Sequence, residues 1–158
     1  ALAALAARPV RGRRCRLPWR GGTLTLIDES YKASPAAVRA ALAVLADTPP
    51  AAGGRRLAVL GDMLELGEES ARLHRELAAP IAAAGIDRVF LIGRAVEALH
   101  EVLPQAVRGG LWADADAAMP SLLRLLQPGD VVSVKGSYAV GLGRVVERLC
   151  ARSAEPET

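Results

Sequence analysis

The sequence contains few cysteines, histidines and aromatic residues. Its 158 residues include two cysteines and two histidines, and only 3% are aromatic. Cys15 and Cys150 are too few for a disulfide framework, and His74 and His100 lack the spacing of zinc ligands. We therefore expect neither a disulfide scaffold nor a metal site built by this chain.

The motifs of several enzyme classes are missing as well. The sequence has no GxxxxGK[ST] phosphate-binding loop and no GxSxG nucleophile motif. Gly141-Leu142-Gly143 matches half of a dinucleotide fingerprint, but the third glycine does not follow at the required spacing. These absences argue against a P-loop enzyme, a dinucleotide-dependent enzyme and a serine hydrolase.

Long apolar runs are also absent. No window reaches the ~18 apolar residues that a transmembrane helix needs. The short apolar run from Ala1 to Ala7 precedes the first positive charges, whereas a signal peptide has its charges first. We therefore expect no membrane span, a cytoplasmic location and reduced thiols.

Positive charge is concentrated at the N-terminal end. The net charge is +3, yet the first 20 residues hold six arginines and no acid, so the other 138 residues hold 14 bases and 17 acids, a net of −3. An arginine arm from Arg8 to Arg20 could bind the phosphates of a nucleic acid. Because Trp19 is the only aromatic residue of the arm, it lacks a base-stacking platform, and we expect no nucleic-acid partner.

Short apolar runs alternate with helical patterns along the rest of the chain. The patterns predict strands at 23–28, 56–61, 88–93, 111–113 and 130–134. Between and after them they predict helices at about 35–48, 69–84, 96–103, 116–126 and 142–149. Ser34 fits an N-cap, Asp116 is expected to cap its helix, and Gly85 fits a C-cap. Repeated strand–helix alternation predicts an α/β domain with a mainly parallel sheet of five to six strands and helices on both faces.

Ligands of such sheets bind at the carboxyl ends of the strands, so the residues after each strand are the candidates for function. The segment 28–35 brings two carboxylates, two hydroxyls, a phenol and an ammonium to a helix N-terminus, which favours anions. Asp62 follows a buried strand and could accept ribose hydroxyls or metal-bound water. Lys135, beside Gly136, could anchor a carboxylate or phosphate.

Each of these segments also has a purely structural interpretation. The first is then a polar loop that ends in an N-cap, and the second is a loop with glycines for backbone freedom. Lys135 is then a lysine that extends along the strand end to reach solvent. His74, one turn into the helix after Asp62, is expected to be structural.

Taken in order, the strand-end segments resemble a known family. They read Asp28-Glu29-Ser30-Tyr31-x-Ala33-x-Pro35, Leu60-Gly61-Asp62-Met63-x-Glu65-Leu66-Gly67 followed by Leu73-His74, and Val134-Lys135-Gly136-Ser137. This order is similar to the C-terminal domain of the Mur ligases, specifically the MurF type, the UDP-N-acetylmuramoyl-tripeptide–D-alanyl-D-alanine ligases. The resemblance runs from Gly12 to Leu149. The usual first motif reads D-S-Y-N-A-N-P, and Lys32 and Ser34 stand in place of its asparagines.

The resemblance implies an ATP-dependent ligase of peptidoglycan synthesis. In that family ATP phosphorylates the carboxylate of the UDP-linked peptide, the amine of D-Ala-D-Ala attacks the acyl phosphate, and Mg²⁺ stabilises the charge. The N-terminal domain of the family binds the UDP part, and the central domain holds the P-loop and most magnesium ligands. The C-terminal domain is Rossmann-like, with three layers, and closes over ATP while it helps to position the dipeptide.

Within this resemblance the chain corresponds to the last domain only. Residues 23–152 would form it, residues 1–22 would be the end of the central domain and a connecting segment, and residues 153–158 would be a frayed tail. The absent N-terminal and central domains are then its partners, and the chain alone is expected to be inactive. The alternative is a free-standing α/β ligand-binding or regulatory module without catalysis.

The resemblance also assigns roles to particular residues. Tyr31, Lys32, Ser34 and Asp62 would lie at the nucleotide, and Lys135, Gly136 and Ser137 would lie at the incoming substrate. Lys135 would act by electrostatics and positioning, and no residue is expected to be a nucleophile, a general base or a metal ligand.

Overall fold

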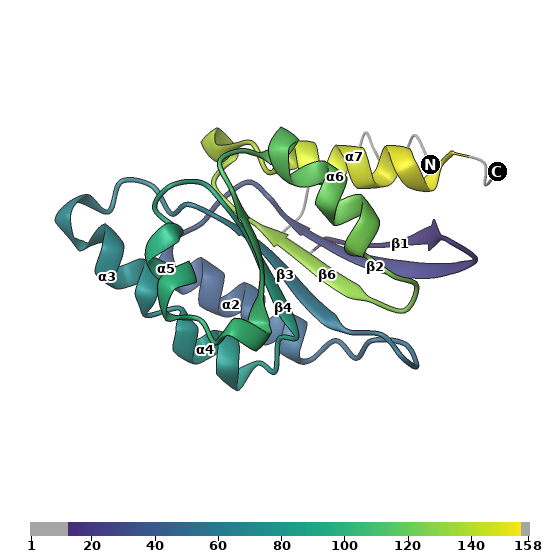
Figure 1. Cartoon of the computed structure of the whole chain (residues 1–158), viewed down its shortest axis with the longest axis horizontal. Coiled ribbons are helices and arrows are strands. Elements are labelled where there is room, and N and C mark those ends of the chain that lie inside the picture. Colours follow the sequence, from purple (N-terminus) through teal and green to yellow (C-terminus); the bar gives the residue numbers. More distant parts are fainter. Residues whose placement is uncertain (1–12, 156–158) are drawn as a thin grey trace.

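The protein forms one mixed sheet between two layers of helices (Figure 1). The computed structural model describes residues 13–155. The six strands lie in the order β1-β2-β6-β3-β4-β5. Their bounds are β1 Arg13–Trp19, β2 Gly22–Glu29, β3 Arg56–Gly61, β4 Arg88–Ile92, β5 Arg108–Trp112 and β6 Val131–Lys135. β1 is antiparallel to β2, and every other neighbouring pair is parallel.

Within residues 13–155, four helices cover one face of the sheet and two cover the other (Figure 1). The first group consists of α2 Pro35–Ala46, α3 Ser70–Arg75, α4 Ala78–Ala83 and α5 Glu97–Val102. The second group consists of α6 Ala115–Leu125 and α7 Gly143–Ser153. Chain order steps from β3 through β5 in one direction and returns to β6 in the middle of the sheet. Because parallel crossovers are right-handed, this reversal moves α6 to the opposite face.

Each layer of helices has its own apolar core. One core joins α6 and α7 to residues such as Leu24, Val59 and Val132, and the other joins α2, α4 and α5 to residues such as Ile27, Leu60 and Leu91. Strands β3 and β6 are buried along almost their whole length, which explains their unbroken apolar sequences. The predicted α/β class, the mainly parallel sheet and the two helical layers are therefore confirmed. Within residues 13–155, no helix is long and apolar enough to cross a membrane.

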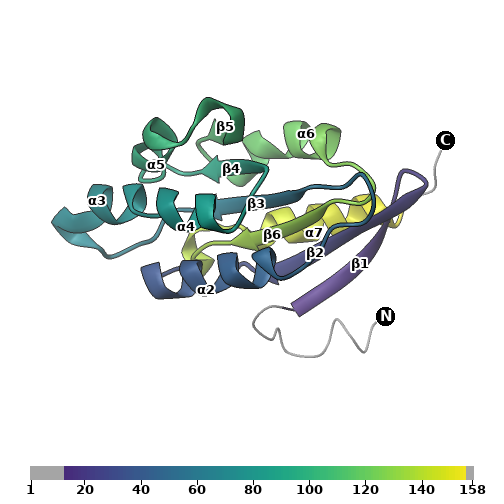
Figure 2. The same ribbon diagram turned by 90° about the horizontal axis from the view of Figure 1, so that it is seen from below.

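The arginine-rich segment begins with an edge strand. β1 and β2 form a hairpin in which Cys15 faces Leu26 and Trp19 faces Gly22. Leu17 and Trp19 are buried in the core on the α7 side, whereas Arg14 and Arg16 are exposed. Figure 2 shows this hairpin at the margin of the sheet, with β5 at the other margin. The remaining arginines of the arm, Arg8 and Arg11, lie outside the described residues.

Three predicted elements differ from the structure. The helix predicted at 69–84 is divided between α3 and α4, since Pro80 has no N–H to donate to the carbonyl of Glu76. Asp114, not Asp116, caps α6, and its Oδ1 accepts from the Ala117 N–H at 2.8 Å. β5 begins at Arg108, three residues earlier than predicted, because Gly109-Gly110 conceals the strand pattern.

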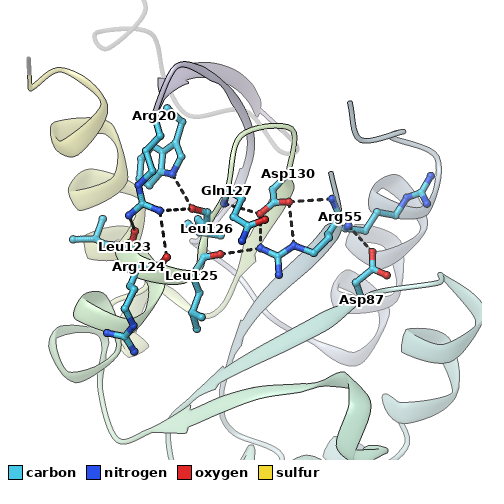
Figure 3. Close-up of polar contacts among 11 residues, drawn as sticks. Arg20, Arg55, Asp87, Leu123, Arg124, Leu125, Leu126, Gln127 and Asp130 are labelled. Atoms are coloured by element: carbon cyan, nitrogen blue, oxygen red, sulfur yellow. Dashed lines mark hydrogen bonds and ion pairs between the residues drawn. The ribbon is translucent and has the colours of Figure 1, made fainter. Parts of the chain in front are cut away.

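A partly buried ion pair between Arg55 and Asp130 joins the amino ends of β3 and β6 (Figure 3). Asp130 is fully buried and accepts hydrogen bonds from the Arg55 backbone, the Arg55 guanidinium and the Gln127 N–H, at 2.8–3.2 Å. The hydrogen bond to Asp130 raises the pKa of Arg55. No sequence motif predicts this network, which lies at the edge of the sheet away from the candidate site.

The β1–β2 turn is hydrogen-bonded to the C-terminal end of α6, close to the Arg55–Asp130 pair (Figure 3). The guanidinium of Arg20 donates to the carbonyls of Leu123, Arg124 and Leu126. Trp19 Nε1 also donates to the Leu126 carbonyl, at 3.0 Å. The last carbonyls of a helix have no partner within it, so these donors satisfy groups that are otherwise left to water.

Candidate functional site

The candidate site lies at the carboxyl edge of β2, β6 and β3. In the parallel register Glu29 is opposite Lys135, and Lys135 is opposite Leu60, so the strand ends lie side by side. Three loops leave the sheet there: 30–34 after β2, 62–66 after β3, and Gly136-Ser137 after β6. The structure therefore brings together the segments that the sequence placed at the carboxyl ends of strands.

Lys135 is buried at this edge and faces a carboxylate of the protein. It is 2% exposed, and its Nζ lies 3.5 Å from Oε1 of Glu29, which is 6% exposed. The same Nζ lies 5.8 Å from the centroid of the Tyr31 ring, within the range of a cation–π contact. The ammonium thus lies within the protein rather than extending into solvent at the strand end.

The loop from Ser30 to Ser34 is fixed at both ends. Asp28 Oδ1 accepts from the Ser30 N–H at 3.1 Å and from the Ser30 hydroxyl at 2.7 Å. Ser34 Oγ accepts from the Ala37 N–H at 3.1 Å, which confirms Ser34 as the N-cap of α2. Between these points Lys32 is exposed and Tyr31 is partly exposed. A loop held in this way can present a cation and an aromatic ring beside the positive end of a helix.

Asp62 is held by the neighbouring loop after β4. Its Oδ1 accepts from the Val96 N–H at 3.0 Å, and its Oδ2 accepts from the Arg94 N–H at 3.1 Å. Gly93, with a φ of +131°, leaves no room for a side chain here, since a Cβ would come within 2.4 Å of Asp62 Oδ1. The carboxylate expected to meet a nucleotide therefore already orders the β4–α5 loop.

His74 fixes the shape of the loop that carries Asp62. The side chain is fully buried, Nε2 accepts from the Met63 N–H at 3.0 Å, and Nδ1 lies 2.7 Å from the Ser70 carbonyl. A carbonyl only accepts, so Nδ1 carries the hydrogen and Nε2 is left as the acceptor. The expected structural role of His74 is confirmed.

The glycine after Lys135 is required by packing. A Cβ on Gly136 would lie 2.5 Å from Leu142 Cδ1, and a Cβ on Gly61 would lie 3.0 Å from the same atom. Leu142 precedes α7, so the two glycines let this helix begin directly against the ends of β6 and β3. Ser137 is partly exposed, and its carbonyl accepts from the Val140 N–H.

The carboxylates near the edge do not form a magnesium site. Across residues 13–155, no group of three or more histidine, cysteine, aspartate or glutamate side chains is placed to hold a metal ion. Glu29 faces Lys135, Asp28 bonds to Ser30, and Asp62 bonds to two backbone N–H groups. The residues present therefore do not fit Mg²⁺, and no step proposed for this chain runs through it.

Two features of the site were not assigned from the sequence. The sequence predicts no partner for Glu29, because Lys135 is 106 positions away. It also predicts no role for Arg94, whose backbone N–H donates to Asp62 Oδ2. Neither interaction has a local sequence signal, because both depend on which strands are neighbours.

The fold and the site define a Rossmann-like α/β domain with loops at the carboxyl edge of its sheet. The chain belongs to the Mur ligase family, since residues 13–138 match the Mur ligase glutamate ligase domain. A relative from Mycobacterium bovis, named UDP-N-acetylmuramoyl-tripeptide–D-alanyl-D-alanine ligase, is 37% identical over 96% of this chain and 33% of its own length. A protein of the same name from Bacillus subtilis is 38% identical over 92% of this chain and 32% of its own length. The chain thus spans about a third of the length of these curated relatives.

Solved structures show the same likeness. The MurF ligase from Thermotoga maritima in complex with ADP superposes with a TM-score of 0.69 at 28% identity, over 90% of this chain and 31% of that chain. A MurF from Acinetobacter baumannii superposes with a TM-score of 0.73 at 25% identity, over 92% of this chain and 31% of that chain. The expected resemblance to the C-terminal domain of the MurF type is therefore confirmed.

Proposed function

We propose that this chain works as the C-terminal domain of an ATP-dependent ligase that joins D-Ala-D-Ala to UDP-N-acetylmuramoyl-tripeptide in peptidoglycan synthesis. The observation that carries the proposal is the match over nearly the whole chain to relatives that bear this name, combined with the shared fold. Because the chain spans about a third of those relatives, catalysis requires the N-terminal and central domains of a longer protein. We assign residues 23–152 to the domain, residues 1–22 to the end of the central domain and the connection, and residues 153–158 to a tail.

The contribution of the domain is to position reactants. The loop with Tyr31, Lys32 and Ser34 would face ATP, whose use by the family is supported by the ADP complex of a structural relative. Lys135 belongs to the segment that would face the incoming dipeptide, and Ser137 is its partly exposed member beyond the buried Gly136. No side chain here would act as a nucleophile. Positioning and electrostatics, completed when the domains close, would be its share of the rate enhancement.

The remaining parts of the proposal concern ions and surroundings. Mg²⁺ would be held by the central domain, since the carboxylates of this edge are engaged elsewhere. The proposed substrates, a nucleotide and a peptide precursor linked to UDP, are consistent with a cytoplasmic enzyme. We therefore place the protein in the cytoplasm.

The direct test uses the full-length gene product. ADP formation should require both the UDP-linked tripeptide and D-Ala-D-Ala, and omission of either substrate should reduce it to background. The product should have the mass of the amide-linked pentapeptide precursor. Substitution of a single D-amino acid for the dipeptide should give no product; efficient ligation of that amino acid, or ADP formation independent of D-Ala-D-Ala, would contradict the proposal.

A variant in the β2–α2 loop tests the part assigned to this chain. Lys32→Ala in the full-length enzyme removes an exposed cation from the nucleotide-facing loop, so the KM for ATP should rise by roughly three- to tenfold, as expected for one solvent-accessible charge–phosphate contact. Arg39→Ala, an exposed arginine on α2, is the matched control and should leave the KM unchanged. Equal effects of the two variants would remove Lys32 from the nucleotide site.

A further inference from the structure

The buried pair Glu29–Lys135 links the last residue of β2 to the last residue of β6. Both side chains are almost without solvent contact, and their charged atoms are 3.5 Å apart. Burying two charges is costly, and removal of one partner leaves the other unsatisfied. An apolar pair of similar size could supply the same stability. A buried ion pair at a ligand-facing edge therefore needs an explanation other than stability.

The position of the pair provides that explanation. Glu29 is the last residue before the loop 30–34, and the Tyr31 ring within that loop lies 5.8 Å from Lys135 Nζ. Lys135 therefore contacts the loop at Tyr31 and the residue before it at Glu29, from a strand that belongs to a different part of the sequence. The other fixed points, Asp28 and Ser34, are contributed by the loop itself and its flanks.

We propose that Lys135 and Glu29 form a positioning pair that sets the conformation of the loop 30–34 for the nucleotide, and that Lys135 acts through Glu29 and Tyr31 without touching a substrate. This inference rests on the proposed function. Lys135 was expected to contact the substrate, but its ammonium is enclosed. Within its segment, contact with a bound molecule therefore falls to the partly exposed Ser137. Lys135 is then a positioning residue rather than a catalytic one.

The first test measures the loop and does not depend on catalysis. Amide hydrogen exchange of the peptide covering 28–37 is compared among the wild-type 158-residue chain, Lys135→Met, Glu29→Gln and the double variant, with β4 as an internal reference. Lys135→Met should speed exchange at 30–34 by about tenfold while β4 is unchanged, since a local opening is sampled more often than global unfolding. The double variant should remain at least about threefold faster than the wild type although no uncompensated charge remains, because the link from β6 to the loop is still absent.

Two controls make the exchange experiment decisive. Arg39→Met removes a positive charge from the exposed side of α2 and should not change exchange in the loop. If Lys135→Met fails to fold, Glu29→Gln keeps the ammonium and tests the same link. Loop exchange that stays at the wild-type rate in folded Glu29→Gln and Lys135→Met chains would overturn the proposal, as would a double variant that returns to the wild-type rate.

The second test separates positioning from substrate contact in the full-length enzyme. Lys135→Met should raise the KM for ATP, the double variant should keep a raised KM for ATP because the link to the loop is still missing, and the KM for D-Ala-D-Ala should stay near its wild-type value. A rise confined to the KM for D-Ala-D-Ala would instead show direct contact and overturn the proposal. If the wild-type enzyme fails to use D-Ala-D-Ala at all, the proposed function fails, and the exchange results still decide whether the pair sets the loop.

Discussion

At the scale of single residues, His74 shows how a buried polar side chain can determine the shape of a loop. The ring bridges α3 and the loop after β3, with one nitrogen donating to the Ser70 carbonyl and the other accepting from the Met63 N–H. Met63 is itself buried, so no water is available to replace this acceptor. The loop that carries Asp62 thus depends on a side chain eleven residues further along the chain.

We expect His74→Ala to lower the free energy of unfolding by about 3 kcal/mol, from the cavity and from the unsatisfied Met63 N–H. Urea denaturation followed by circular dichroism measures the change. His100→Ala is the matched control, because His100 is only partly buried on α5 and its loss should cost less than about 1 kcal/mol. Equal losses for the two histidines would show that the bridge of His74 contributes nothing.

The Cys150 thiol makes a contribution that depends on pH. Burial raises the pKa of Cys150, and the neighbouring Cys15 raises it further. As pH rises, the thiol ionises first in the unfolded chain, at about pH 8.5, whereas the folded chain still binds the proton. The contribution to stability is therefore fully present below the unfolded pKa and is lost as pH rises through the folded pKa.

This direction of the pH dependence predicts how the stability of the Cys150→Ala variant differs from that of the wild type. The wild-type chain should lose more stability than the variant between about pH 7 and about pH 10, since only the wild type has this thiol to ionise in its unfolded state. Denaturation curves of both proteins at the two pH values give the difference, and all other titrating groups cancel. A difference that is independent of pH would contradict the raised pKa of Cys150.

Residue types at the site were predictable, and their pairing was not. Polar residues after apolar strands indicated the loops with Tyr31, Asp62 and Lys135, because carboxyl ends of parallel strands meet at one edge. The sequence could not show that Asp62 bonds to the β4–α5 loop, or that Lys135 faces Glu29. Those contacts follow from the strand order, in which β6 lies between β2 and β3.

At the scale of elements, the C-terminal end of α6 depends on a residue from the β1–β2 turn. Arg20 has a φ of +45°, a backbone conformation that residues other than glycine adopt at a cost in free energy. Its guanidinium nevertheless donates to three carbonyls at the end of α6. The positive group also interacts favourably with the negative end of the helix dipole. The turn is therefore strained locally and stabilised by its contact with α6.

These opposing effects can be separated by two substitutions at Arg20. Arg20→Ala loses the hydrogen bonds and keeps the strained backbone, so it should destabilise the fold by about 1–2 kcal/mol. Arg20→Gly loses the same bonds and relieves the strain, so it should be more stable than the alanine variant by roughly 0.5–1 kcal/mol. Arg16→Ala, exposed on the same hairpin, should change stability by less than about 0.5 kcal/mol. If Arg20→Ala is as stable as the wild type, the contact with α6 is not stabilising.

Periodicity predicted which elements exist better than where they end. The apolar strands β2, β3, β4 and β6 and the helix α2 were evident, because burial on one or both faces imposes a clear pattern. The break before Pro80 and the early start of β5 at Arg108 were missed, since each depends on a local exception to the pattern. Asp114 and Asp116 are both plausible caps in sequence, and the choice between them is made by where α6 meets the sheet.

At the scale of the whole molecule, both faces of the sheet are covered by helices of the chain itself. Two apolar cores lie on opposite faces, and neither needs a residue from another domain to be closed within the described region. The candidate edge is different, because under the proposed function its residues only position ligands, and its described residues include no nucleophile, P-loop or magnesium site. Folding and activity should therefore separate when the chain is studied alone.

The purified 158-residue chain should fold cooperatively and still lack ATPase and ligase activity. We expect one sigmoidal unfolding transition by circular dichroism and by tryptophan fluorescence, as for a two-state domain. Phosphate release from ATP should equal that of a buffer blank, and calorimetry should show ADP binding in the millimolar range or none, since the loops at one edge provide only part of a nucleotide site. The full-length enzyme, assayed in parallel, provides the positive control. Robust ATP hydrolysis by the isolated chain, or micromolar affinity for a nucleotide, would show that this edge is a complete site and that a free-standing binding module describes the protein better.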